Sequence, residues 1–85
     1  MVVKNMFINK TEDGKNNLCG KKVTVLRKAR RLSQRALADK LQLYGLNVDK
    51  NAIQRMESGL RFVTDIELSA LKNVFGVSYE DLLDE

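Results

Sequence analysis

A short stretch in the second half of the chain carries side chains that could read the edges of nucleic-acid bases. Its hydrogen-bonding residues have helical spacing and are Lys50, Asn51, Gln54 and Arg55. Arg and Lys suit guanine, and Asn and Gln suit adenine, because each can make paired hydrogen bonds in the major groove. Ile53 and Met56 would face the opposite side of such a helix, towards a core. The same polar residues would also suit an ordinary solvated surface, so the surrounding elements must decide.

The surrounding chain contains regular signals for the ends of short helices. Four polar residues each follow an apolar residue and precede another at the fourth helical position, which is the hydrophobic staple. These candidate N-caps are Ser33, Asp49, Thr64 and Ser78. Three glycines suit left-handed helix ends, and they are Gly45, Gly59 and Gly76. Together these signals predict five helices, at 21–31, 34–44, 50–58, 65–75 and 79–83.

Apolar residues at helical spacing predict an all-α core. They are Val23, Leu26, Leu37, Ala38, Leu41, Ile53, Met56, Ile66, Leu68, Leu71, Phe75, Tyr79, Leu82 and Leu83. The first eight residues could form a short strand or a disordered arm, and residues 9–18 are polar and expected to be flexible. We therefore divide the chain into an N-terminal, partly flexible arm (1–19) and one helical domain (20–85).

Composition narrows the classes of function. The 85 residues suffice for one domain with a modest core, and they include one cysteine and no histidine. Cys/His zinc sites, histidine-based acid–base catalysis and internal disulfides are thereby excluded. We see no signal peptide, no membrane-spanning run, no catalytic constellation and no phosphate-binding glycine loop. The sequence therefore predicts a cytoplasmic protein that is not an enzyme and needs no metal or cofactor.

Basic and acidic residues are sorted along the chain. Residues 20–32 hold six basic residues and no acidic one, whereas residues 63–85 hold six acidic residues and one lysine. This sorting fits a molecule that turns one face towards phosphate and the other away from it. A charged, solvated first helix would explain the basic segment equally well.

Several motifs follow one another in a specific order: Leu26-Arg27-Lys28-Ala29-Arg30, Leu32-Ser33-Gln34, Ala36-Leu37-Ala38, Ile53-Gln54-Arg55-Met56-Glu57-Ser58-Gly59 and Phe75-Gly76-Val77-Ser78. With these motifs, residues 20–83 resemble the XRE type of helix-turn-helix domain, the family of Cro and phage-repressor DNA-binding domains. The resemblance implies a compact, five-helix, lambda-repressor-like fold. It also implies that the helix at 50–58 enters the major groove of double-stranded DNA.

The resemblance implies roles for individual residues. Base contacts fall to the polar face of the recognition helix, that is, to Lys50, Asn51, Gln54 and Arg55. Phosphate contacts fall to Gln34 and Arg61, and Gln34 also braces the recognition helix. Arg27 and Glu57 correspond to a structural salt bridge between the first and third helices.

The connection between the second and third predicted helices departs from the family pattern. It is a few residues longer than usual and reads Gln42-Leu43-Tyr44-Gly45-Leu46-Asn47-Val48. We expect the second helix to continue up to Gly45, with Leu43, Tyr44 and Leu46 extending the core. Arg35 is a second departure, because relatives commonly have an acid there. This exposed basic residue is a candidate for a phosphate contact, and the alternative is that it only lies in solvent.

The sequence thus predicts a sequence-specific binder of double-stranded DNA, such as a bacterial or prophage transcriptional regulator of the repressor type. A lone domain of this kind is expected to bind a palindromic site as a homodimer, through the helix at 79–83 or through residues 2–8. The alternative is an antitoxin-like or other protein-interaction module that uses the same scaffold to bind a protein partner.

Overall fold

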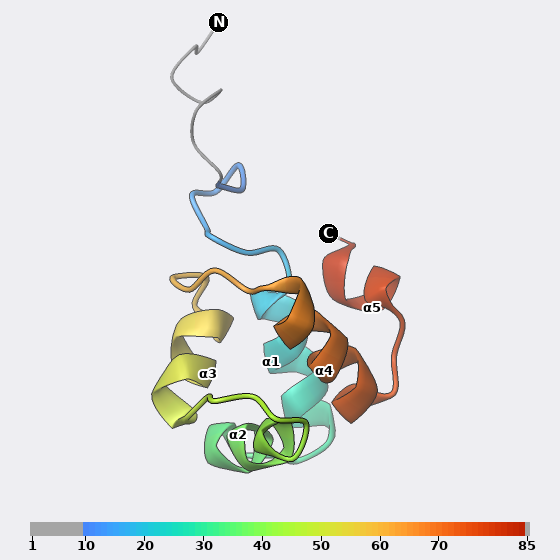
Figure 1. Ribbon diagram of the computed structural model, residues 1–85. Helices are drawn as coiled ribbons and strands as arrows, with labels where there is room; N and C mark the ends of the chain where they lie inside the picture. The colour runs from blue at the N-terminus through green and yellow to red at the C-terminus, as the bar shows by residue number, and fades with distance from the viewer. Residues whose placement is uncertain (1–9, 85) are drawn as a thin grey trace, which may run out of the picture.

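The computed structural model describes residues 10–84, which fold into five α-helices without a strand (Figure 1). The helices are α1 (Gly20–Ala29), α2 (Gln34–Gln42), α3 (Lys50–Glu57), α4 (Asp65–Phe75) and α5 (Tyr79–Leu83). α2 and α3 lie next to each other at one side of the molecule, and α5 lies at the opposite side, against α1 and α4 (Figure 1). The predicted all-α, five-helix architecture is confirmed.

Side-chain caps begin four of the five helices at the predicted positions. Each cap accepts a hydrogen bond from the backbone N–H three residues further on. The capping residues are Ser33, Asp49, Thr64 and Ser78. Thr64 and Ser78 complete capping boxes with Glu67 and Asp81, and the hydrogen bonds from Ser78 lower the pKa of the Asp81 carboxyl. Local sequence therefore sets where these helices start.

One apolar core lies between the helices, and every helix contributes to it. Its largest fully buried side chains are Val23, Leu37, Leu41, Ile53, Met56, Leu71 and Leu82. Each such side chain contributes about 1.5–3 kcal/mol on burial. Cys19 belongs to the same core, and burial raises the pKa of its thiol to about 11. The thiol is therefore uncharged at neutral pH. The buried side chains of Ile53 and Met56 fix the inner face of α3 against this core.

The long connection between α2 and α3 does not extend the core as predicted. α2 ends at Gln42, and a tight turn with backbone hydrogen bonds of the i to i+3 type leads to Gly45, which has φ of 85°. This turn directs Leu43 into solvent, where it is 86% exposed, and leaves Tyr44 half-exposed. Only Leu46 of the three predicted residues packs against the core.

α4 reverses the expected positions of an apolar and an acidic residue. Ile66 was predicted to lie in the core, but it is 69% exposed, whereas Glu67 is buried. The buried carboxylate is tolerated because Arg61 and the backbone N–H of Thr64 donate hydrogen bonds to it. Tyr79, also predicted to be core, is partly exposed and lies under the ammonium group of Lys72.

The turn between α1 and α2 also differs from the prediction. The first helix was expected to reach residue 31, but it ends at Ala29. Arg31 adopts a left-handed conformation with φ of 56°, and the Leu32 N–H donates back to the carbonyl oxygen of Arg27. This arrangement closes the helix in the manner usual for glycine, although the residue is an arginine.

Part of the segment 9–18, which was predicted to be polar and flexible, packs against the helical domain. Residues 16 and 17 donate hydrogen bonds to the chain at the end of α3. The strand or arm predicted for residues 1–8 lies outside the described residues. Within residues 10–84, no helix has the length and apolar character needed to cross a membrane.

Candidate nucleic-acid interface

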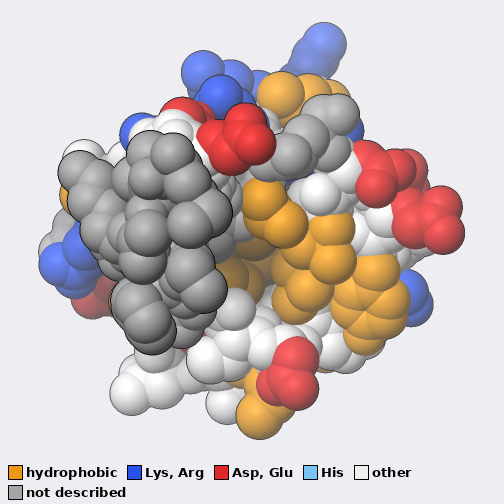
Figure 2. All heavy atoms as spheres, turned by 90° about the horizontal axis from the view of Figure 1, so that it is seen from above, with side chains coloured by type: hydrophobic (Ala, Val, Ile, Leu, Met, Phe, Trp, Pro, Cys, Tyr) orange, Lys and Arg blue, Asp and Glu red, His pale blue; other side chains and the backbone are white. Residues whose placement is uncertain are grey.

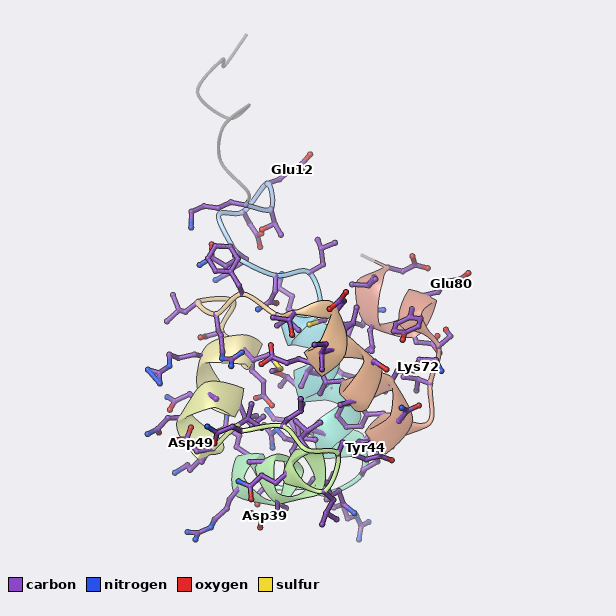
Figure 3. The ribbon with its side chains drawn as sticks, in the orientation of Figure 1. Glu12, Asp39, Tyr44, Asp49, Lys72 and Glu80 are labelled. Carbon is purple, nitrogen blue, oxygen red and sulfur yellow. The ribbon has the colours of Figure 1, made fainter. Side chains whose placement is uncertain are left out.

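The outer face of α3 presents the four residues predicted to contact bases. All of them are exposed, and they are Lys50, Asn51, Gln54 and Arg55. The inner face of the same helix is closed by Ala52, Ile53 and Met56, which are buried. Nitrogen-tipped side chains project outward from this side of the molecule (Figure 3). One helix therefore separates a packing face from a hydrogen-bonding face.

The hydrogen-bonding face is not neutralised by neighbouring acids in the part of the chain that the structure describes. Between residues 10 and 84, neither Lys50 nor Arg55 forms a salt bridge. The acid closest in sequence, Asp49, caps α3 by accepting a hydrogen bond from Ala52 N–H at 2.8 Å. Both cationic groups are thus available to a ligand that is rich in negative charge or in acceptor atoms.

The C-terminal end of α3 is tied to α1 by the predicted ion pair. Arg27 Nε donates to Glu57 Oε2 at 2.6 Å and Arg27 Nη2 donates to Glu57 Oε1 at 3.1 Å. The two side chains are only 12% and 7% exposed. Arg27 also donates to the Leu32 carbonyl oxygen in the turn before α2. The bidentate geometry and the burial make this pair a structural link.

Gln34 joins the same network from the first turn of α2. Its Nε2 donates to Glu57 Oε1 at 3.1 Å, and the side chain is partly exposed. This contact ties the first turn of α2 to the C-terminal end of α3. Arg35, the next residue, is exposed and makes no salt bridge with another described residue.

Arg61 lies in the loop after α3 and is engaged within the protein. Its Nη1 donates to both carboxylate oxygens of Glu67 at 2.9 Å and to the Phe62 carbonyl oxygen at 3.3 Å. Its Nε and Nη2 groups donate to no other described residue, and its side chain is 30% exposed. The guanidinium therefore orders the loop and keeps donors facing solvent.

Sequence reasoning missed two asparagines that contact the end of α3. Asn17 Nδ2 donates to the carbonyl oxygens of Met56 and Arg61, and Asn16 Nδ2 donates to that of Leu60. The N-cap residue Cys19 makes no side-chain cap, and Asn17 Oδ1 accepts the hydrogen bond from Gly20 N–H instead. Asparagines commonly bond to nearby backbone in this way, so the pair before α1 was a signal for a helix start.

Other faces of the molecule differ in character from the outer face of α3. Lys72 and Glu80 lie at the side opposite Asp49 (Figure 3). The view from above shows another face, on which hydrophobic side chains gather among acidic and basic ones (Figure 2). Residues 10–84 contain no group of three or more side chains suited to hold a metal ion.

The helical order and the site geometry define a helix-turn-helix protein, with α2 and α3 as the two helices of the motif. A family model described as helix-turn-helix matches residues 25–82. The chain therefore belongs to this family and contains an XRE-type helix-turn-helix domain. No curated protein and no solved structure matches the chain significantly. The family consists of double-stranded-DNA-binding transcription regulators, which are typically not enzymes.

Proposed function

We propose that this protein binds double-stranded DNA sequence-specifically and reads the major groove with α3. The observation that carries the proposal is the division of α3 into a fully buried apolar face and an exposed face of amide and cationic side chains. The first residues of the second helix of such motifs reach base edges. An exposed face of this chemistry matches what the groove offers.

Within this proposal, each polar residue of α3 has a defined partner. Lys50 and Arg55 pair with guanine, and Asn51 and Gln54 pair with adenine. Gln34, Arg35 and Arg61 contact phosphates on either side and set the register of the domain. Phosphate contacts dominate the affinity and make it depend on salt, whereas base contacts determine which sequence is bound.

The biological role that fits is a repressor-like transcriptional regulator of bacterial or prophage origin, located in the cytoplasm and associated with the nucleoid when bound. We infer a homodimer on a two-fold symmetric site, since a single small domain reads only a short half-site. Exposed apolar side chains on the face in Figure 2 support contact with another protein surface. In our proposal, the partner surface belongs to a second copy of this protein. The alternative is the surface of an antitoxin-like protein partner.

The decisive experiment is selection of bound duplexes from a random DNA pool at moderate salt. The natural chain is compared with Asn51→Ala/Arg55→Ala and with a control, Asn73→Ala. The control also removes an exposed amide side chain, but from α4 instead of α3. We expect the natural chain and the control to enrich the same short, two-fold symmetric sequence and the α3 variant to lose it.

The size of the effect follows from the bonds removed. Each paired contact to a base is worth about 1–3 kcal/mol of discrimination, so two losses reduce specific affinity by about 30-fold or more. Both substitutions are at exposed positions, so stability changes by less than about 0.5 kcal/mol. Folded proteins that all fail to enrich a sequence would contradict DNA reading and direct the search to protein partners.

A further inference from the structure

The C-terminal end of α3 is held by a segment that lies before α1 and outside the family match at 25–82. Asn17 Nδ2 donates to the Met56 carbonyl oxygen at 3.0 Å and to the Arg61 carbonyl oxygen at 2.8 Å. Asn16 adds two bonds, from its N–H to the Gly59 carbonyl oxygen at 2.7 Å and from Nδ2 to the Leu60 carbonyl oxygen at 2.9 Å. Four carbonyl groups in and after the last turn of α3 thus have partners in this segment.

These bonds fall where a helix is least able to satisfy itself. The last carbonyl groups of a helix have no partner within it and need donors from elsewhere. The Met56 carbonyl oxygen accepts from Gly59 N–H at 3.1 Å, and Asn17 supplies its second donor. Met56 lies in the last turn of α3, and Arg61 lies in the loop that leads to α4. One amide group spans both, so it fixes the direction in which the chain leaves α3.

The contact is also sterically close. Gly20 opens α1, and a β-carbon placed there would approach the Met56 carbonyl oxygen to 2.5 Å and that of Glu57 to 3.0 Å. The first turn of α1 therefore rests directly on the backbone at the end of α3. Asn17 Oδ1 accepts a hydrogen bond from Gly20 N–H at 2.8 Å, so the same side chain holds both helices at this crossing.

We propose that Asn17 is a positioning residue for DNA recognition, which fixes the tilt of α3 by clamping its C-terminal end to the start of α1. The inference rests on the proposed function, because tilt matters only if the outer face of α3 reads bases. Arg27 and Gln34 hold Glu57 by its side chain, whereas Asn17 holds the adjacent backbone. A helix fixed at both points keeps its base-reading side chains at one angle to the groove.

Two substitutions separate this role from simple capping of α1. Asn17→Asp keeps an oxygen that accepts from Gly20 N–H, and its charge suits a helix N-terminus. It removes both amide donors and places a carboxylate against the carbonyl oxygens of Met56 and Arg61. Asn17→Ala removes all three bonds. The control is Asn73→Ala, because Asn73 is exposed on α4 and its side chain makes no hydrogen bond to another described residue.

The full-length chain is tested on the duplex selected as above and on an unrelated duplex, at equal salt and below the unfolding transition of every variant. We expect Asn17→Asp and Asn17→Ala to lower specific affinity about 10-fold, the equivalent of about 1.4 kcal/mol. Affinity for the unrelated duplex and the slope of log K against log salt stay unchanged, because no phosphate contact is lost. Asn73→Ala matches the natural chain in every measurement.

Three outcomes would overturn the inference. Unchanged discrimination in a folded Asn17→Asp variant would show that the tilt of α3 does not depend on the clamp. An equal loss on both duplexes would show a general defect. Failure of both variants to fold where Asn73→Ala folds would make Asn17 a residue of the fold alone. If the natural chain itself does not discriminate between duplexes, the proposed function fails instead, and the variants are not needed to see it.

Discussion

The two ends of α3 differ in how many polar contacts they make with the rest of the protein. At the C-terminal end, the Glu57 carboxylate accepts from Arg27 and Gln34, and the backbone at Met56 accepts from Asn17. At the N-terminal end, Lys50 and Asn51 are exposed, and the first turn is held by the Asp49 cap and by the buried side chains of Ala52 and Ile53. The C-terminal end of α3 is therefore anchored by polar contacts, and the polar side chains at its N-terminal end face solvent.

This difference shows how a short helix can be both rigid and available. An isolated helix of eight residues is not stable in water, so its order must come from tertiary contacts. If those contacts lay on the outer face of α3, its polar side chains would already be hydrogen-bonded within the protein and could not bind a ligand. Placing the polar anchors at one end, and the apolar anchors on the inner face, leaves the donor groups unpaired. The following predictions test the anchored end.

The largest effect is expected from breaking the ion pair that anchors α3 to α1. Glu57→Ala leaves the Arg27 guanidinium buried without its charge partner, which costs about 3–5 kcal/mol of unfolding free energy. The measurement is urea unfolding. Asp39→Ala is the matched control, because it removes an exposed acid from α2 and is expected to change stability by less than about 0.5 kcal/mol. Equal stability of the two variants would contradict the anchoring role.

An intermediate effect is expected where the chain leaves the anchored end. Arg61→Ala removes two hydrogen bonds from the Glu67 carboxylate, which is 11% exposed, and costs about 2 kcal/mol. In our proposal Arg61 also contacts phosphate, so the slope of log K against log salt falls by about one. Arg35→Ala is the comparison, with the same fall in slope and unchanged stability. Lost stability with an unchanged slope would remove Arg61 from the interface.

The smallest effect is expected in the turn that brings α2 to the anchored end. Arg31 has φ of 56°, a conformation that costs a residue with a β-carbon about 1–2 kcal/mol. Arg31→Gly is therefore expected to raise stability by about 1 kcal/mol in thermal or urea unfolding. Arg30→Gly is the control and lowers stability, because Arg30 has negative φ and its side chain donates to the Phe75 carbonyl oxygen. A less stable Arg31→Gly variant would show that its side chain outweighs the strain.

The sequence by itself determined where four of the helices begin and which face of α3 is polar. Ser33, Asp49, Thr64 and Ser78 begin helices where predicted, because a cap depends on residues only a few positions away. The spacing of Ile53 and Met56 placed the four polar residues of α3 outside, since helical periodicity is also local. The partner of Arg27 came from the family resemblance and not from spacing.

Only the tertiary structure decided which distant groups satisfy one another. The bonds from Asn17 to Met56 and Arg61 span 39 and 44 positions, and no local pattern specifies them. Glu67 could turn inward and Ile66 outward because Arg61 supplies donors to the buried carboxylate. The turn that ends at Gly45 leaves the hydrophobic side chain of Leu43 exposed to solvent. Burial follows from the sum of long-range packing and hydrogen bonding, so residue type alone could not predict these positions.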